Sequence, residues 1–187
     1  MSTIRIYIFS LLLLGLTFAV SCNKEPTPPT DLHPVSLTYP KYIPPPNLSA
    51  DNPLTEEGIA LGRKLYYDPI LSNNGKSCSS CHPQQSGFTD SIFNALPHVN
   101  LAWNKYFLWN GKVKGSLEDI MDFEVREFFS TDVSKLNAEP TYPDLFRKVF
   151  NAKTIKEEHI IKALSQFMAT HVSMDSKVDK YLKRNGC

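Results

Sequence analysis

Cys78-Ser79-Ser80-Cys81-His82 is the stretch that decides the fold of this chain. It matches the C-x-x-C-H attachment signature of c-type haem, in which two thiols add across the porphyrin vinyl groups and the following histidine binds the iron. Cys78, Cys81 and His82 are therefore predicted to hold one covalent haem c, with His82 as the proximal ligand. A thioredoxin-like pair or half of a zinc site are alternatives. A thioredoxin-like pair requires a βαβ pattern, which the sequence lacks, and a zinc site requires more ligands than one such motif supplies.

The composition is that of an ordinary globular protein. The chain has 187 residues, of which 42% are hydrophobic and 21% charged, and its net charge is +1. This length suits one domain. The balanced charge offers no electrostatic attraction for nucleic acid or anionic lipid, so no nucleic-acid partner is predicted.

The first 21 residues are predicted to be a signal peptide. Arg5 precedes an apolar run over residues 6–20, which is too short and one-sided to cross a membrane. Small residues precede Cys22, which favours a lipoprotein lipidated at Cys22 over a plain signal peptide with a free thiol. The mature protein is then an exported, periplasmic or outer-membrane-anchored lipoprotein of a Gram-negative bacterium, attached to the membrane by its lipid only. Only Cys187 is left over, so no structural disulfide is predicted.

Residues 22–51 are predicted to be a tether and residues 52–187 the folded domain. The tether contains most of the 14 prolines, including Pro44-Pro45-Pro46. Such a segment is extended, resembles polyproline II and buries little surface.

Several helices are predicted in the folded part, so the fold class is mainly α. Thr55 caps a helix that runs to about Tyr67, where Asp68 and Pro69 end it. A capping box at Ser116 begins a second helix, with its apolar stripe on Leu117, Ile120, Met121, Val125 and Phe128.

Two more helices follow. Pro143 is placed in the first turn of one, and a capping box of Thr154 and Glu157 begins the last long helix. Strictly alternating strands are absent from the aromatic-rich stretch 91–111. The chain is therefore expected to form a c-type cytochrome-like haem domain with long ordered loops.

Several phrases occur in a fixed order around the haem motif. They are LGRKLYYDP at 61–69, SCSSCH at 77–82, GFTD at 87–90, VNLAW at 99–103, FLWNGK at 107–112 and YPDLF at 142–146. Together they resemble the N-terminal haem domain of the bacterial di-haem cytochrome c peroxidase family, which includes the methylamine-utilisation haem enzymes. The resemblance covers residues 52–182.

The resemblance implies reduction of hydrogen peroxide, with electrons from a small cytochrome or a second haem domain. Family members carry a second C-x-x-C-H domain that these residues do not encode. Two alternatives therefore stay open: a single-haem electron-transfer module, or a truncated or partnered fragment without activity of its own. A calcium ion at the domain junction is also left open.

The family resemblance further implies roles for two site residues. His98 corresponds to the distal histidine that leaves the iron before peroxide binds, although a loop histidine near the haem edge is the alternative. Glu127 best matches the glutamate that moves a proton between the peroxide oxygens, with Glu124 in reserve and a solvated carboxylate as the alternative. His171 is expected to be a core histidine, and Met121 and Met168 are expected to pack.

Trp109 and two basic residues complete the predicted site. Trp109 matches the family tryptophan between the two haems, where an indole relays electrons or fills space. Arg63 and Lys112 are placed to pair with haem propionates, against the alternative of solvated surface charge.

Overall fold

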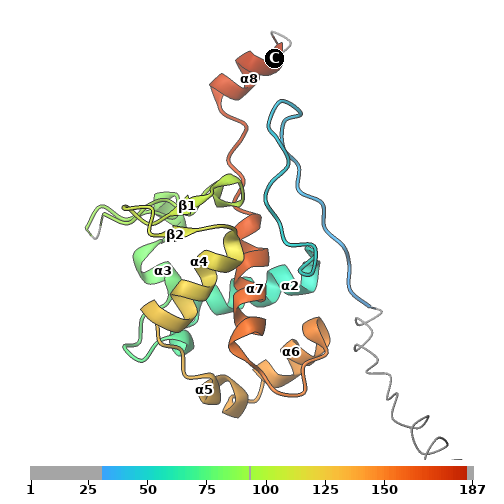
Figure 1. The fold of residues 1–187 in the computed structure, drawn as a ribbon, viewed down its shortest axis with the longest axis vertical. Helices are drawn as coiled ribbons and strands as arrows, with labels where there is room; N and C mark the ends of the chain where they lie inside the picture. Colours follow the sequence, from blue (N-terminus) through green and yellow to red (C-terminus); the bar gives the residue numbers. More distant parts are fainter. Residues whose placement is uncertain (1–30, 93, 185–187) are drawn as a thin grey trace, which may run out of the picture.

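The computed structural model describes residues 31–92 and 94–184, and its regular secondary structure is almost entirely helical (Figure 1). The mainly α prediction is therefore confirmed. The helices and strands, in chain order, are α2 (Glu56–Tyr67), η1 (Pro69–Leu71), α3 (Cys78–Cys81), η2 (Gln84–Ser86), η3 (Leu101–Trp103), β1 (Tyr106–Phe107), β2 (Val113–Lys114), α4 (Leu117–Phe123), η4 (Glu124–Phe128), α5 (Val133–Ala138), α6 (Tyr142–Phe150), α7 (Glu157–Ala169) and α8 (Lys177–Arg184).

Helix α2 begins and ends as its sequence predicts. The Thr55 side chain accepts a hydrogen bond from the Gly58 N–H, and Asp68 ends the helix in an extended conformation. Pro69 then opens η1, whose first free N–H donates to the Asp68 carboxylate. The buried face of α2 consists of Gly58, Leu61, Gly62, Leu65 and Tyr66.

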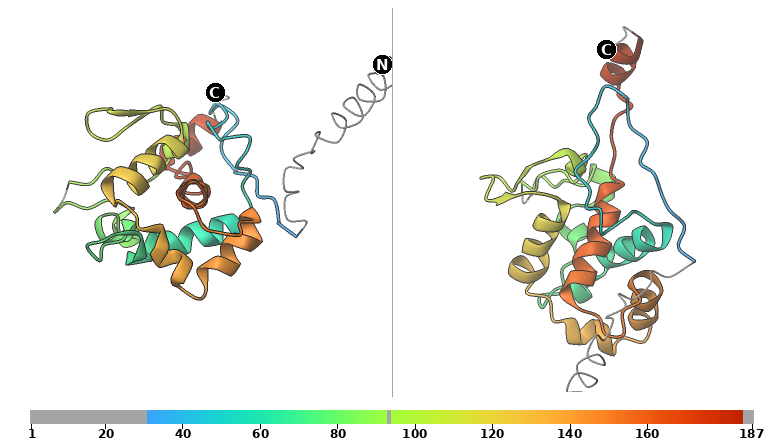
Figure 2. Two further views of the ribbon diagram at one scale, coloured as in Figure 1. Left: turned by 60° about the horizontal axis from the view of Figure 1, so that its bottom comes forward. Right: turned by 45° about the vertical axis from the view of Figure 1, so that its right-hand side comes forward.

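The centre of the fold is the crossing of α2 and α7. Figure 2 (left) looks roughly along α7 and shows α2, α4 and α6 around it. The helices approach so closely that a Cβ on Gly62 would lie 2.0 Å from the Ala163 carbonyl oxygen. Leu61, Leu65 and Leu164 are almost fully buried here, which makes this crossing the hydrophobic core.

Helix α4 starts at the predicted capping box and then widens into η4, a π-helical segment. The wider turn rotates the chain, so that Phe129 is 7% exposed while Phe128 is 64% exposed. The prediction that Phe128 belongs to the apolar stripe is therefore wrong, whereas Leu117, Ile120, Met121 and Val125 are buried as expected.

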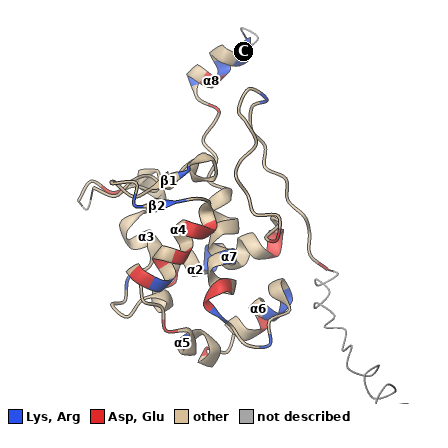
Figure 3. Cartoon of the chain, viewed as in Figure 1, with Lys and Arg blue, Asp and Glu red and all other residues tan. Residues whose placement is uncertain are grey.

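Ion pairs connect the α4–η4 segment to α7. Figure 3 shows acidic residues along α4 and at the start of α7. Arg126 lies between them and pairs with Asp122 at 2.7 Å and with Glu157. Arg126 therefore joins η4 to the first turn of α7.

The predicted capping box of Thr154 and Glu157 is wrong, because α7 begins only at Glu157. Ile155 is 3% exposed and its N–H donates to the Asn137 side chain, which holds this stretch outside the helix. The backbone N–H of Lys156 instead donates to Nδ1 of His159. Pro143, by contrast, lies in the first turn of α6 as predicted.

The described part of the proline-rich stretch, residues 31–51, is docked on the domain. Val35 and Leu54 share a backbone hydrogen bond, the Asn47 N–H donates to the Ala102 carbonyl, and the Trp103 indole donates to the Pro44 carbonyl. Val35, Leu37 and Leu48 are partly buried against the core. These residues bury more surface than a free tether does, while the boundary between tether and domain stays a prediction.

Within the described residues, no helix is long and apolar enough to cross a membrane. The predicted signal peptide, Cys22 and Cys187 lie outside the described residues.

Candidate functional site

The C-x-x-C-H motif forms the short helix α3, with His82 directly after its last residue. Ser77 and Ser80 cap this turn through a reciprocal pair of hydrogen bonds. Cys78 and Cys81 are one helical turn apart and both are free thiols. The predicted helical turn is therefore present, and its two thiols project from the same side.

The thiol of Cys78 is poorly suited to thiolate chemistry. Burial raises its pKa well above the usual range, and the nearby carboxylate of Glu124 raises it further. A redox-active or zinc-binding cysteine needs the opposite shift. No group of three or more histidine, cysteine, aspartate or glutamate side chains in the described chain could hold a metal ion. A thioether, which carries no charge, suits this environment.

The imidazole of His82 is oriented by a backbone carbonyl. Its Nδ1 lies 3.1 Å from the Phe88 oxygen, so the Nδ1–H donates and Nε2 keeps its lone pair. A histidine that binds a metal is commonly held by such a bond from its other ring nitrogen. Phe88 turns its carbonyl inward from a left-handed conformation, with a φ of 60°. The residues of the motif therefore fit a covalently attached haem.

His98 lies against the face of His82. The two ring centroids are 3.4 Å apart and the rings are 16° from parallel. The hydroxyl of Tyr66 joins the pair, because it donates to the His82 carbonyl at 3.0 Å and lies 3.2 Å from Nδ1 of His98. Burial lowers the pKa of His98 well below its usual value, with further lowering by His82 and His171.

His171 extends this cluster from the end of α7. Its ring stacks on Phe88 with centroids 4.1 Å apart, and its Nδ1 donates to the His98 carbonyl at 2.9 Å. Its Nε2 is buried without a hydrogen-bond partner among the described residues. His171 is thus the core histidine that the sequence predicts, but only half of its hydrogen-bonding capacity is met.

Glu124 and Glu127 lie in η4 but differ in their surroundings. Desolvation raises the pKa of Glu124 to about 7, and its charge acts on Cys78. The side chain of Glu127 is exposed. The structure therefore places Glu124 close to the haem motif, whereas Glu127, the residue predicted first, points to solvent. Burial was the missing signal, because the sequence does not show which turn of a π-helical segment faces inward.

The remaining predicted residues lie at the surface. Trp109 is 69% exposed, and its indole N–H donates to the Asn94 carbonyl. The alternative of a core aromatic is therefore wrong. Arg63 and Lys112 are exposed and lie over the rings of Tyr67 and Phe123, at 6.0 and 5.0 Å from the centroids. The structure does not bring these three side chains together with His82.

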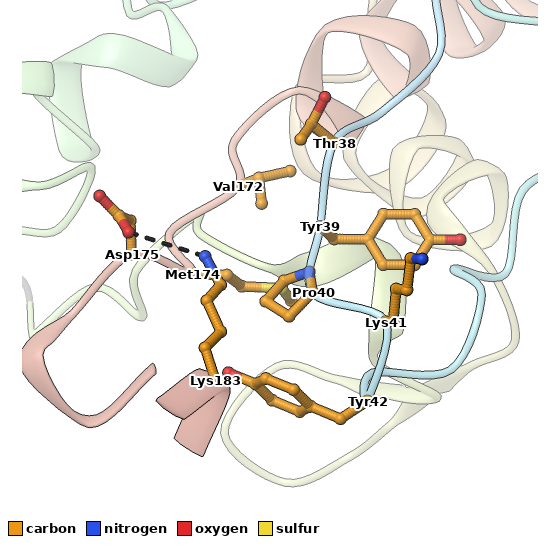
Figure 4. Close-up of a pocket in the computed structure, with 9 residues that line it drawn as sticks. All are labelled: Thr38, Tyr39, Pro40, Lys41, Tyr42, Val172, Met174, Asp175 and Lys183. Carbon is orange, nitrogen blue, oxygen red and sulfur yellow. Dashed lines mark ion pairs between the residues drawn. The ribbon is translucent and has the colours of Figure 1, made fainter. Parts of the chain in front are cut away.

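A cavity of about 600 Å³ lies elsewhere, between residues 38–42 and the segment that leads to α8 (Figure 4). Tyr39, Tyr42 and Met174 line it, and Asp175 pairs with Lys183 beside it at 3.8 Å. None of its lining residues belongs to the haem motif or to its histidine cluster. The cavity is therefore separate from the candidate site.

Comparison with known proteins agrees with the site. The family description "Di-haem cytochrome c peroxidase" matches residues 56–186. The methylamine utilization protein MauG of Methylorubrum extorquens is 32% identical, covering 76% of this chain and 45% of its own length. The cytochrome c551 peroxidase of Nitrosomonas europaea is 31% identical, covering 73% of this chain and 46% of its own length.

A solved structure shares the fold. The crystal structure of a MauG-like protein associated with microbial copper homeostasis superposes with a TM-score of 0.70 at 32% identity, covering 81% of this chain and 51% of that one. The chain thus spans about half the length of the relatives it matches.

Proposed function

Because the chain belongs to the di-haem cytochrome c peroxidase family, we propose that it is a haem c oxidoreductase that reduces hydrogen peroxide. Cys78 and Cys81 would hold one haem through thioether bonds, and His82 would bind its iron. The observation that carries this proposal is the His82 imidazole, whose Nδ1–H is fixed by the Phe88 carbonyl so that Nε2 is left for a metal. When bound, the haem supplies the iron centre and the electrons for cleavage of the O–O bond.

Glu124 is proposed as the acid–base residue. Reduction of peroxide to water needs a group that takes a proton from one peroxide oxygen and delivers it to the other. A carboxyl with a pKa of about 7 is suited to both steps near neutral pH, since both of its protonation states are populated there. Its proximity to Cys78 places this carboxyl beside the motif. Glu127 is the alternative residue for the same role.

Electrons are proposed to enter from a small cytochrome or a second haem domain. Trp109 is exposed and its indole N–H donates to the Asn94 carbonyl, and Ile92 and Tyr106, which lie close to these residues in the sequence, are 84% and 63% exposed. A partner docked on these aromatic and apolar side chains would cover Trp109 and bring its donor close to the indole. The donor is proposed by class only, as a haem protein.

Export and lipid anchoring are proposed from the sequence. The apolar run before Cys22 and the small residues that flank it support this.

Paired substitutions in the haem-loaded protein test the proposed chemistry. Glu124→Gln should lower peroxide turnover by about 100-fold or more with haem retained, since a general acid–base residue typically contributes at least that factor. Glu127→Gln is the matched control, because it makes the same change three residues further along η4, and it should leave turnover within about twofold. The opposite ranking would assign the role to Glu127.

The pH profile gives a second test. Glu124 must be ionised to take the first proton, so turnover should rise as the pH increases through about 7. This rise should be absent from Glu124→Gln. A low-spin haem that stays inert to peroxide after reduction would instead support the electron-transfer module.

A further inference from the structure

The cavity between residues 38–42 and the segment that leads to α8 has an apolar floor and a charged rim (Figure 4). Pro40 is buried in the floor, and three further side chains that line the cavity are half-buried: Tyr39, Tyr42 and Met174. The charged side chains that line it are exposed: Lys41, Asp175 and Lys183. A cavity of about 600 Å³ with this division has the size and the character of a small-molecule site.

The walls of this cavity are connected to one another and to the domain. The Tyr42 hydroxyl donates to the Asp179 carboxylate at 3.0 Å, which joins the proline-rich stretch to α8. The same carboxylate accepts from the Ser176 N–H at 2.8 Å at the start of α8. The Tyr39 ring meets the ring of Trp103 edge to face, with centroids 5.4 Å apart. Binding therefore does not have to order these walls, which favours affinity.

The rim of the cavity favours a negatively charged ligand. It carries two lysines and one aspartate. The carboxylate of Asp175 lies 3.5 Å from Nζ of Lys180 and 3.8 Å from Nζ of Lys183, so its charge is already matched. Lys41 forms no ion pair within residues 31–92 and 94–184. An ammonium group at the edge of an apolar floor can bind a carboxylate through a charge-assisted hydrogen bond.

We propose that this cavity is a binding site for a small aromatic carboxylate. The ring of the ligand packs against the two tyrosine rings, Tyr39 and Tyr42, and against the thioether of Met174. Its carboxylate faces the ammonium group of Lys41 at the rim. The site takes a ligand other than peroxide and does not depend on the proposed haem chemistry, because none of its lining residues belongs to the haem motif or to the histidine cluster.

Isothermal titration calorimetry of the full haem-loaded chain with naphthoate tests this site. The parent should bind one naphthoate per chain in a saturable manner. Lys41→Ala should raise the Kd by about tenfold or more, because a hydrogen bond to a charged group contributes at least that factor. Lys177→Ala is the matched control, since Lys177 is an exposed lysine of α8 that does not line the cavity, and its Kd should stay within about twofold of the parent's.

Two further ligands test the chemical class. Naphthalene methanol keeps the ring without the charge, so it should bind the parent about tenfold or more weakly than naphthoate and should bind Lys41→Ala equally. Decanoate keeps the charge without the ring and should bind about threefold or more weakly than naphthoate, because aromatic pairs contribute beyond the area that they bury. Tyr39→Leu should reduce this preference for naphthoate over decanoate.

Several results would overturn the proposal. A parent that does not bind naphthoate saturably has no such site. Equal Kd values for Lys41→Ala and Lys177→Ala would reduce the effect to general surface charge. Decanoate that binds as tightly as naphthoate would overturn the aromatic class, and naphthalene methanol that binds as tightly would overturn the carboxylate. Both lysines are exposed, so the comparison of their variants stands even if Tyr39→Leu does not fold.

Discussion

The crossing of α2 and α7 ends in two polar clusters, and their central side chains, Gln166 and His171, differ in how completely their hydrogen bonds are made. At the start of α2, the Gln166 side chain accepts from the Thr55 N–H at 3.0 Å and donates to the Asn52 side chain at 2.9 Å. At the other end, Tyr66 and His98 are paired, but Nε2 of His171 is buried and has no partner within residues 31–92 and 94–184. Both clusters lie among apolar side chains of the same helix pair.

The difference separates a structural cluster from a functional one. A buried side chain with a partner on each of its polar atoms, as Gln166 has, favours one packing, because a rearrangement leaves an atom unsatisfied. A buried nitrogen without a partner costs free energy that folding alone does not recover, and such exceptions concentrate at functional sites. The cluster of Gln166 is therefore interpreted as part of the scaffold, and the cluster of His171 as part of the haem site.

Gln166→Leu should have the largest effect on stability. It leaves the Thr55 N–H and the Asn52 oxygen without their partner in a buried position, which costs about 2 kcal/mol of unfolding free energy. Guanidinium unfolding followed by circular dichroism measures this loss. The haem potential should not change, because the cluster lies at the far end of α2 from the motif.

Gln85→Leu provides a matched control for that substitution. Gln85 is exposed in η2, close to the motif in sequence, so the same change there should alter stability by less than about 0.5 kcal/mol. Equal stabilities of the two variants would show that the Gln166 network does not hold the crossing. A changed haem potential in Gln166→Leu would show that the cluster around Gln166 also affects the haem site, and is not purely structural.

His171→Leu should reverse this pattern, with a small effect on stability and a clear effect on the site. It loses the bond to the His98 carbonyl, but it also removes a buried, unpaired nitrogen, so the two costs of about 1 kcal/mol each nearly cancel. The electron paramagnetic resonance g values of the haem should shift, because His171 stacks on Phe88, whose carbonyl orients the His82 ring. A stability loss as large as that of Gln166→Leu would instead make His171 a scaffold residue.

The helix boundaries could be predicted from the sequence more completely than the geometry of the candidate site. Thr55, Ser116 and Pro143 mark helix starts by local hydrogen bonding and ring geometry, which depend on a few neighbouring residues only. The capping box at Thr154 failed because Ile155 is pulled into the core and Asn137 takes its N–H. A tertiary contact therefore outweighed the local sequence pattern.

The site resisted prediction because its geometry depends on contacts between distant segments. Cys78, Cys81 and His82 follow from adjacent residues, so the motif alone located them. The stack of His98 on His82 depends on a left-handed Phe88, and the burial of Glu124 depends on a π-helical turn. Neither has a local sequence signal, so His98 as a ligand and Glu127 as the proton carrier were predicted from the family resemblance, and both roles stay predictions.

The smallest expected effect concerns an exposed pair at the start of α2. Nδ1 of His33 lies 2.8 Å from the Glu57 carboxylate, which raises the pKa of His33 and contributes to lowering that of Glu57 to about 2. The histidine's contribution to stability is fully present below its ordinary pKa of 6.5 and is lost as the pH rises through the raised value. The carboxylate's contribution is present above 4.5 and is lost as the pH falls towards 2.

The pair should therefore hold residues 33–35 on α2 best between about pH 4.5 and 6.5. Hydrogen exchange of the Val35 and Glu56 amides, which bond across this junction, measures the effect. After correction for intrinsic exchange, their protection should fall above this window in the parent and should be lower and flat in His33→Ala. Exchange at buried α7 amides should not change in either protein. A fall that persists in His33→Ala would assign the pH dependence to another group, and the docking of the proline-rich segment would then rest on its backbone and apolar contacts alone.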